Sequence, residues 1–331
     1  MNIKKSITSV SIVVISALII YGLIMVRQIF SDNTKFEATE VYVYIPTDSD
    51  YEAVKQIVAP YVNDMDRFDA VANKKKYPNN VKPGKFLFKK GMNSNELINA
   101  LRINNEVKLS FNNQERLEDF AGRIGSEIEA DSVSLLAAFK DTTFLKENGF
   151  NEENVLTMFI PNTYELYWNT TATKFRDKMI KEYRNFWNEE RVAKAKSQGL
   201  TPTEATILAS IVHKESVKKD ERPRIAGVYL NRLHKGILLQ ADPTVIYAVK
   251  KKSNDFKQVI KRVLNKDLQV ASPYNTYYSA GLPPGPIAMP DITAIEAVLN
   301  PEKHNYIYFC ASVTRFGYHD FAVTQAEHEQ N

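Results

Sequence analysis

Cysteine is almost absent from this 331-residue chain, since Cys310 is the only one. No intrachain disulfide can therefore form, and the apolar residues around Cys310 predict a buried small side chain. The five histidines show no zinc-ligand spacing, so we expect no metal and no other cofactor. A net charge of only +4 gives no nucleic-acid signature, although it suits an acidic polymer or a membrane surface.

Long uncharged runs are equally scarce, and the one of membrane-spanning length covers residues 7–26. Lys4 and Lys5, within residues 1–6, favour a cytoplasmic N-terminus and an exported remainder. A signal peptide is the alternative, but no small-x-small cleavage motif follows, and no nearby cysteine permits a lipoprotein. We therefore expect a single-pass anchor in the inner (plasma) membrane, with the rest of the chain on the extracytoplasmic (periplasmic) side.

After a polar linker at residues 27–40, residues 41–110 predict a small α+β module. β-Branched and aromatic residues mark its strands, while Asn93 and Glu96 form the capping box of a short helix. The expected strands cover residues 41–45, 85–88 and 107–111, and the expected helices cover residues 51–62 and 93–102. A spacer and a glycan-binding module both fit this pattern.

Residues 111–331 predict a larger α+β domain with a helical lead-in at about 112–150. Its further expected elements are a polar loop at 159–167, an amphipathic helix at 173–198, a helix at 291–299 and a β-hairpin of 306–312 with 317–323. Thr324 and Glu327 form a last capping box, so we expect a final helix longer than the turn that precedes Asn331.

The stretch from Thr201 to Ser216, TPTEATILASIVHKES, predicts the central helix of that domain. Thr201 and Glu204 form a capping box, and Pro202 suits the first helical position. Apolar residues then follow at helical spacing, and Glu215 continues their stripe at the C-terminal end.

Glu215 is a candidate general acid because of this position. Partial desolvation and the negative end of the helix dipole both disfavour its charged form, so its pKa should rise. A carboxyl group that stays protonated near neutral pH can cleave a glycosidic bond by general-acid catalysis. A solvated glutamate, or one paired with Lys214 or Lys218, is the plainer interpretation.

Two loops rich in tyrosine, asparagine, glycine and proline follow this helix. The segments SPYNTY at 272–277 and GLPPGPI at 281–287 predict rigid backbone with ring faces and amide groups that suit sugars. Between the helix and these loops, Asp242 followed by proline predicts a helix cap, and Gln240 and Asp242 could line a cleft as well.

Taken together, the motifs resemble the YceG/MltG family of endolytic murein transglycosylases. The matching segments, in order, are LASIVHKES, AGVYLNRL, LLQADPTVIY, SPYNTY, GLPPGPI and GYHDFAVTQAEH. The resemblance covers nearly the whole chain and implies an α+β fold with three parts. These are a single N-terminal transmembrane helix, a LysM-like module at 41–110 and a catalytic domain at 111–331.

The resemblance implies that Glu215 is the catalytic acid and base. The implied substrate-binding residues are Gln240, Asp242, Tyr274, Asn275, Thr276, Tyr277, Pro283 and His319. The implied reaction cuts the β-1,4 bond between N-acetylmuramic acid and N-acetylglucosamine in nascent peptidoglycan and leaves 1,6-anhydro ends, which terminates strand elongation. Implied partners are glycan strands, the inner membrane and peptidoglycan synthases, without nucleic acid.

One residue departs from the family pattern: His213 stands where an acidic residue is common. It lies two residues before Glu215, about 200° around a helix, so we expect it to face away from Glu215.

Two alternatives remain open at this point. One is a hydrolase that uses a second carboxylate, for which Glu165, Glu221 and Asp242 are candidates. The other is a non-catalytic, membrane-anchored peptidoglycan-binding scaffold.

Overall fold

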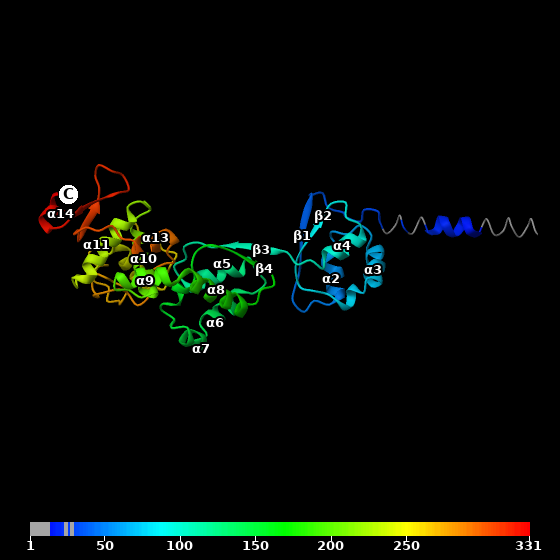
Figure 1. The fold of residues 1–331 in the computed structure, drawn as a ribbon, viewed down its shortest axis with the longest axis horizontal. Helices are drawn as coiled ribbons and strands as arrows, with labels where there is room; N and C mark the ends of the chain where they lie inside the picture. Colours follow the sequence, from blue (N-terminus) through cyan, green and yellow to red (C-terminus); the bar gives the residue numbers. More distant parts are fainter. Residues whose placement is uncertain (1–13, 23–25, 27–29) are drawn as a thin grey trace, which may run out of the picture. The chain divides into compact units, whose positions relative to one another are not determined.

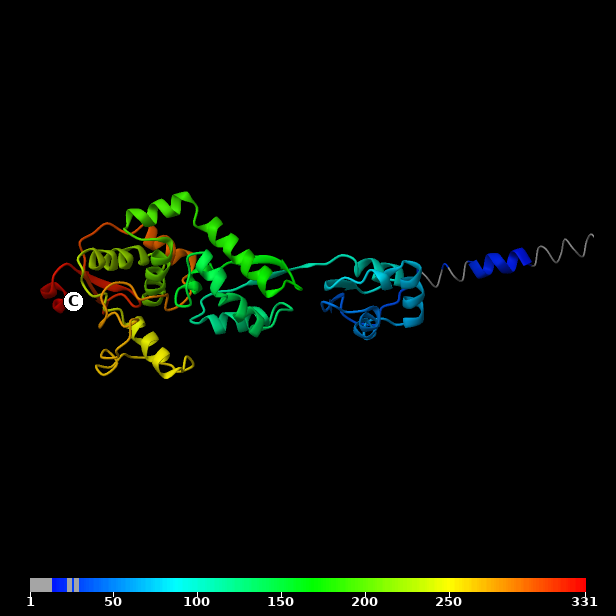
Figure 2. The same ribbon diagram turned by 90° about the horizontal axis from the view of Figure 1, so that it is seen from below.

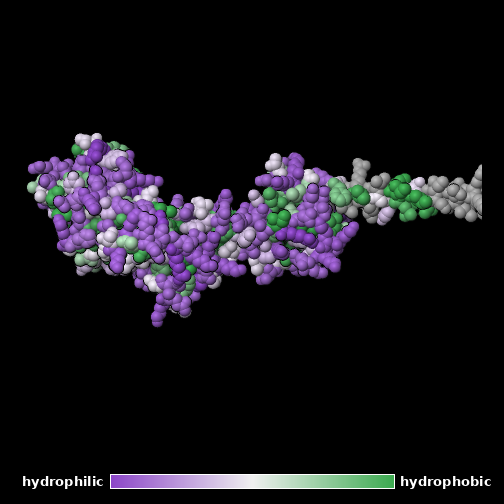
Figure 3. Space-filling model, in the orientation of Figure 1, coloured by the Kyte–Doolittle hydropathy of each residue, from purple (hydrophilic) through white to green (hydrophobic). Residues whose placement is uncertain are grey.

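The computed structural model describes residues 14–22, 26 and 30–331. Residues 14–22 are helical, and Figure 3 shows their apolar side chains in green. These side chains are 52% to 64% exposed: Val14, Ile15, Leu18, Ile19, Ile20 and Tyr21. The predicted membrane segment at 7–26 lies partly outside the described residues. Within them, no helix has the length and apolarity that crossing a bilayer requires.

The chain divides into two compact units. The first unit contains the chain up to Lys108 together with residues 165–170. The second unit contains residues 109–164 and 171–331. The strands β3 (Glu106–Ser110) and β4 (Thr163–Tyr167) pair with each other, and the division passes through this pair. Helices and strands occur in both units, which confirms the predicted α+β class (Figure 1).

The first unit has the order β1 (Glu40–Ile45), α2 (Tyr51–Val58), α3 (Met65–Lys74), β2 (Gly84–Lys89) and α4 (Ser94–Ala100). The two strands are antiparallel, with Glu40 opposite Lys89 and Ile45 opposite Gly84. Alternate side chains point inward because successive strand residues face opposite sides. These inward residues are Val43 and Ile45 from β1 with Phe86 and Phe88 from β2, and the helices pack over them.

In the second unit, three helices follow β3: α5 (Leu117–Gly125), α6 (Ser132–Phe139) and α7 (Thr142–Glu147). They match the predicted helical lead-in. Phe120 and Phe139 stack 5.5 Å apart between ring centroids, and both lie against Phe159 and Phe175. This aromatic cluster joins α5 and α6 to α8 (Ala172–Phe186) and provides the core of the lead-in.

The central helix α10 (Pro202–Glu215) has the capping box predicted at Thr201 and Glu204. Eight consecutive side chains, from Ala205 to Val212, are buried, because α9 (Glu189–Ser197), α11 (Arg222–His234), α12 (Asp242–Ser253) and α13 (Ile292–Leu299) all pack against it. Figure 2 shows α12 in yellow, projecting with the following loop from this group of helices. A helix buried on all sides holds its C-terminal residue in a fixed position.

The chain ends in the predicted β-hairpin, β5 (Tyr308–Ala311) with β6 (His319–Ala322), and in α14 (Gln325–Gln330). Phe309 and Phe321, opposite each other in the register, pack against the core around α10 and α11. The hairpin thereby fixes His319 at the start of β6.

Three predicted elements differ from the structure. The helix expected at 173–198 is two helices, because Asn188 caps a new helix, α9, through the Arg191 backbone N–H. The expected loop at 159–167 contains the strand β4, whose alternate residues are buried. The N-cap of α12 is Ala241, so the predicted cap by Asp242 is wrong, and Asp242 is the first helical residue instead.

Candidate active site

Glu215, the last residue of α10, lines a cavity of about 240 Å³. The cavity lies between the end of α10 and four other segments. These are α11, the start of α12 with the residues before it, the loop at 272–281 and the hairpin. The other residues that line the cavity are Arg232, Leu239, Gln240, Asp242, Tyr277, Phe309, Cys310, Ala311 and His319. A small recess with several converging polar groups is the usual form of a binding or catalytic site.

The carboxyl group of Glu215 is held by Tyr229, which projects from α11. The Tyr229 hydroxyl donates to Glu215 Oε1 at 2.6 Å. Burial raises the pKa of Glu215 to about 7, the Tyr229 hydrogen bond opposes that rise, and the charge of Asp242 adds to it. Glu215 is therefore protonated in a large fraction of molecules near neutral pH, as a general acid must be.

Removing the Tyr229 hydroxyl is expected to raise the pKa of Glu215 further. A hydrogen bond to a carboxylate favours the ionised form, and its loss in Tyr229→Phe should move the titration midpoint up by about one pH unit. Carboxyl ¹³C NMR of the protein labelled at glutamate measures this midpoint directly. Tyr318→Phe, which removes the hydroxyl bonded to Asp220, serves as the control and should leave it in place. A midpoint unchanged in Tyr229→Phe would contradict the assigned role of the bond.

Four of the eight predicted binding residues lie in the cavity with Glu215: Gln240, Asp242, Tyr277 and His319. The Tyr277 hydroxyl donates to Asp242 Oδ1 at 2.7 Å, which joins the loop to α12. Gln240 has a φ of 52°, a left-handed conformation that is costly for a residue with a Cβ. Its backbone N–H donates to the Thr276 carbonyl, and this bond holds the strained residue at the cavity wall.

The other four predicted residues do not line this cavity. Asn275 and Thr276 are buried and hold the loop together, with the Asn275 amide donating to the carbonyls of residues 268 and 270 and the Thr276 hydroxyl bonded to Thr244. The Tyr274 hydroxyl donates to Glu153 Oε2 at 2.7 Å. Pro283 lines a separate cavity of about 710 Å³ near the start of α10. These side chains support the loop rather than meeting a ligand beside Glu215.

That larger cavity does not resemble a catalytic site. The carboxylate that lines it belongs to Glu204, which is already used in the capping box of α10. Gly285, in the same proline-rich loop as Pro283, has a structural role, because a Cβ there would lie 1.9 Å from the Glu153 carbonyl oxygen. The loop is therefore built for close packing.

Sequence patterns did not indicate Arg232, which is buried beside the cavity. Its Nε donates to the Ile307 carbonyl at 2.6 Å, and its Nη1 donates to the carbonyls of Leu238 and Leu239 and to Gln240 Oε1. One guanidinium thus ties the wall at 238–240 to the entry of the hairpin. The available signal was an arginine within an otherwise apolar helical stripe of α11.

His319 is held by the buried carboxylate of Glu221, the residue before α11. Glu221 Oε2 lies 2.7 Å from His319 Nδ1, and Oε1 accepts from the His319 backbone N–H at 2.8 Å. The side chains of Glu221 and His319 are 3% and 15% exposed. Both carboxylate oxygens of Glu221 therefore bind one histidine at the cavity wall.

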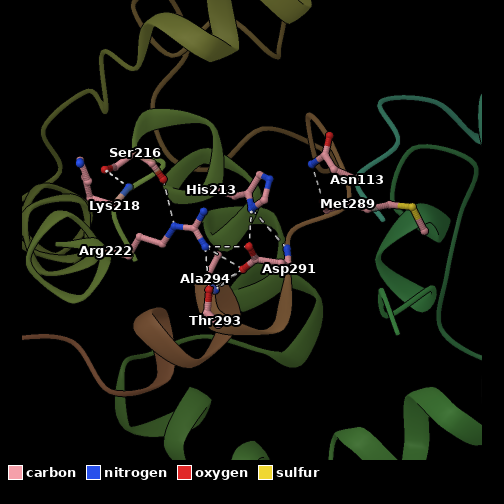
Figure 4. A network of polar contacts seen from close by, with 9 residues as sticks. All are labelled: Asn113, His213, Ser216, Lys218, Arg222, Met289, Asp291, Thr293 and Ala294. Atoms are coloured by element: carbon pink, nitrogen blue, oxygen red, sulfur yellow. Dashed lines mark hydrogen bonds and ion pairs between the residues drawn. The ribbon is translucent and has the colours of Figure 1, made fainter. Parts of the chain in front are cut away.

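His213 faces away from Glu215, as its position on the helix predicts. Its Nδ1 lies 3.3 Å from Oδ2 of Asp291, the N-cap residue of α13. Figure 4 shows both residues in a network with Arg222 of α11. Arg222 binds both oxygens of Asp291 and also donates to the carbonyl of Ser216. Burial alone would raise the pKa of Asp291, but hydrogen bonds from His213, Arg222 and Thr293 hold it well below its usual value. The network fixes the chain just beyond Glu215.

Helix α12 also lines two further cavities. Pro243, Ile246 and Lys250 line a neighbouring cavity of about 200 Å³, which Lys214 also lines. Tyr247 lines that cavity and the next one, of about 470 Å³, which Tyr274 and Phe256 also line. A helix rises about 1.5 Å per residue, so this face of α12 runs about 18 Å from Asp242 to Asn254.

Within the described residues, no group of three His, Cys, Asp or Glu side chains is placed to hold a metal ion.

An α+β unit with a recessed acid at the end of a buried helix agrees with the family that the motifs indicate. The sequence model of the YceG-like family matches residues 43–331, and the chain belongs to that family. A relative from Bacillus subtilis (strain 168), named endolytic murein transglycosylase, is 29% identical over an aligned length of 340 residues, and the alignment covers 96% of this chain and 89% of the relative.

Two further similarities agree. A protein of the same name from Streptococcus pneumoniae serotype 2 (strain D39 / NCTC 7466) is 34% identical over 175 residues, which are 52% of this chain and 30% of that protein. A crystal structure of a yceG-like protein from Listeria monocytogenes aligns with a TM-score of 0.58 and 26% identity, covering 88% of this chain and 98% of that one.

Proposed function

We propose that this protein is an endolytic murein transglycosylase, a lyase that cuts peptidoglycan glycan strands. The observation that carries the proposal is the Glu215 carboxyl group, which is recessed in a cavity. Burial raises its pKa to about 7, close to neutral pH. Family membership and the names of the relatives from B. subtilis and S. pneumoniae support the same activity.

The reaction needs one acid and no activated water. Glu215 donates its proton to the oxygen that leaves toward N-acetylglucosamine, while the 6-hydroxyl of N-acetylmuramic acid attacks the anomeric carbon of the same sugar. The C1–O4 bond breaks, a C1–O6 bond forms, and the hydroxyl proton passes to a base, for which the newly formed Glu215 carboxylate is available. Since the nucleophile is part of the substrate, its effective concentration is high.

Three other residues of the cavity position the sugar. Gln240 offers an amide beside the reacting bond, and Asp242 and Tyr277 form a hydrogen-bonded pair at the same wall. The neighbouring cavities along α12 provide room for further sugars and carry the aromatic faces of Tyr247 and Phe256. A series of recesses suits an enzyme that binds within a strand.

The two-carboxylate hydrolase is less well supported. Glu221 has both oxygens engaged by His319, and Glu165 pairs with Lys108 on the surface, which leaves Asp242 as the remaining second carboxylate. A scaffold without activity would not need the energetically costly burial of Glu215.

Product masses test the proposal. Glycan strands digested by the chain should yield fragments ending in 1,6-anhydro-N-acetylmuramic acid, which are lighter by one water than hydrolytic fragments. Mass spectrometry of muropeptides, read against a muramidase digest of the same strands, separates the two reactions. Fragments with reducing ends would establish a hydrolase, and intact strands would leave only a binding function.

The first unit and the N-terminal segment have supporting roles in this proposal. The order β1–α2–α3–β2 with antiparallel strands fits a LysM-like module, for which we infer glycan binding. The exposed apolar side chains of residues 14–22 and the uncharged run at 7–26 favour a single-pass anchor in the plasma membrane. Anchored there, with its catalytic domain on the extracytoplasmic side, the protein would meet nascent strands beside peptidoglycan synthases.

A further inference from the structure

We propose that Glu221 and His319 form a dyad that serves as the base of the reaction, with His319 Nε2 receiving the proton of the attacking 6-hydroxyl. This inference rests on the proposed transglycosylase activity. It divides the chemistry between two residues: Glu215 acts as the acid, His319 is a second catalytic residue, and Glu221 is the positioning residue behind it.

The geometry of Glu221 sets the tautomer of His319. A carboxylate accepts hydrogen bonds, so the nitrogen 2.7 Å from Glu221 Oε2, Nδ1, must carry a proton. In the neutral ring Nε2 is then the unprotonated nitrogen, and the imidazole lines the same cavity as Glu215. A bound substrate would thus meet a donor acid and an acceptor nitrogen within one recess of about 240 Å³.

The position of Glu221 supports a dedicated role. It is the N-cap residue of α11, yet its side chain makes no cap hydrogen bond. Both of its oxygens instead hold His319, one through the ring and one through the backbone. A carboxylate only 3% exposed is costly to bury, and using it to orient one imidazole at a cavity wall is typical of a catalytic pair.

The proton balance closes without another reactant. Glu215 gives its proton to the leaving oxygen, and the 6-hydroxyl gives its own to His319 Nε2 as the C1–O6 bond forms. The products leave with Glu215 ionised and His319 protonated, and one proton transferred through water from Nε2 to Glu215 restores the starting state. The net reaction only rearranges the substrate's own atoms.

Glu221→Gln tests the dyad with little change in size. The amide that replaces the carboxylate can donate to Nδ1, which would move the ring proton to Nε2 and leave no acceptor in the cavity. We expect kcat to fall by a factor of about 100 or more while KM changes little. In ¹⁵N NMR the His319 signals should show Nδ1 protonated in the parent chain and Nε2 protonated in the variant. A purely structural hydrogen bond would give the same reversal, so the fall in kcat with little change in KM is the result that identifies His319 as the base.

His319→Gln provides the second test through the pH profile. With His319 as base, kcat/KM of the parent chain should fall on the acid side as Nε2 becomes protonated, and this acid limb should be lost in His319→Gln. His234→Gln, which alters an imidazole bonded to the Gln198 carbonyl away from the cavity, is the matched control and should keep the parent profile. The charged groups around His319 are Glu221, Glu215, Asp242, Arg232, Asp320 and Arg315.

The outcomes are separable. Parent-like kcat in Glu221→Gln, an unchanged tautomer, or an acid limb retained in His319→Gln would each overturn the dyad and leave Glu215 as the sole acid and base. Absence of anhydro ends in digests by the parent chain would instead overturn the transglycosylase proposal itself.

Discussion

Replacing Glu215 by Gln is expected to lower the rate of glycan-strand cleavage by a factor of about 10³. The amide cannot donate an acidic proton to the leaving oxygen, although it keeps the size of the side chain and can still accept from the Tyr229 hydroxyl. The loss should therefore appear in kcat, with little change in binding. Release of muropeptides from glycan strands, followed by chromatography, measures the rate.

The variant should remain folded, which separates chemistry from stability. The pKa of Glu215 is raised from its usual value to about 7, so the folded protein binds a proton that the unfolded chain has already lost between about pH 4.5 and pH 7. Stability of the parent chain should thus fall as pH rises through this window, and Glu215→Gln should abolish this contribution.

Glu204→Gln, in the capping box at the other end of α10, is the matched control for activity. Parent-like cleavage by Glu215→Gln would refute the assignment of the acid.

The sequence was sufficient to predict the helix that carries Glu215. Its start depends on Thr201, Pro202 and Glu204, which act within four residues of one another, and such local signals survive folding unchanged. The β-hairpin at the end of the chain and the capping box of α4 were predicted for the same reason. The family followed from the combined motifs, and the match over residues 43–331 confirms it.

Elements with conflicting local signals were missed. Pro161 and Asn162 suggested a loop, but Tyr164 and Leu166 are buried at alternate positions of β4, a period-two pattern too short to outweigh the turn residues. The helix α3 had no prediction, since the charged residues among its apolar positions obscured the helical period.

The site was predictable only in part, because its defining contacts are long-range. Asp242 gave a cap signal, but its carboxylate accepts from Tyr277, 35 residues away. The bond from Tyr229 to Glu215 depends on how α11 packs against α10, and no local pattern contains that information. The motif SPYNTY forms a loop closed by its own hydrogen bonds, yet of Tyr274 to Tyr277 only the last side chain lines the cavity.

The second large effect concerns Arg222, whose replacement by Met is expected to lower the free energy of unfolding by about 3 kcal/mol. Its side chain is 4% exposed and joins its own helix, α11, to the start of α13 and to the end of α10. It donates to Asp291 Oδ1 and to Thr293 Oγ1 at 2.7 Å each, and to the Ser216 carbonyl at 3.0 Å. Met would leave the partly exposed carboxylate of Asp291 and the buried carbonyl of Ser216 without their strongest donor. Urea denaturation followed by circular dichroism measures the change.

Arg224→Met is the matched control, two residues along the same helix. Arg224 pairs with Glu302 at 2.9 Å, but the two side chains are 37% and 42% exposed, so the loss should stay within about 1 kcal/mol. Equal effects of the two substitutions would contradict the structural role given to the network around Arg222.

Because Arg222 holds the carbonyl of Ser216, directly after Glu215, Arg222→Met should also slow cleavage under conditions where the protein is still folded. The same guanidinium that joins α11 to the start of α13 also holds the end of α10, the helix that carries Glu215.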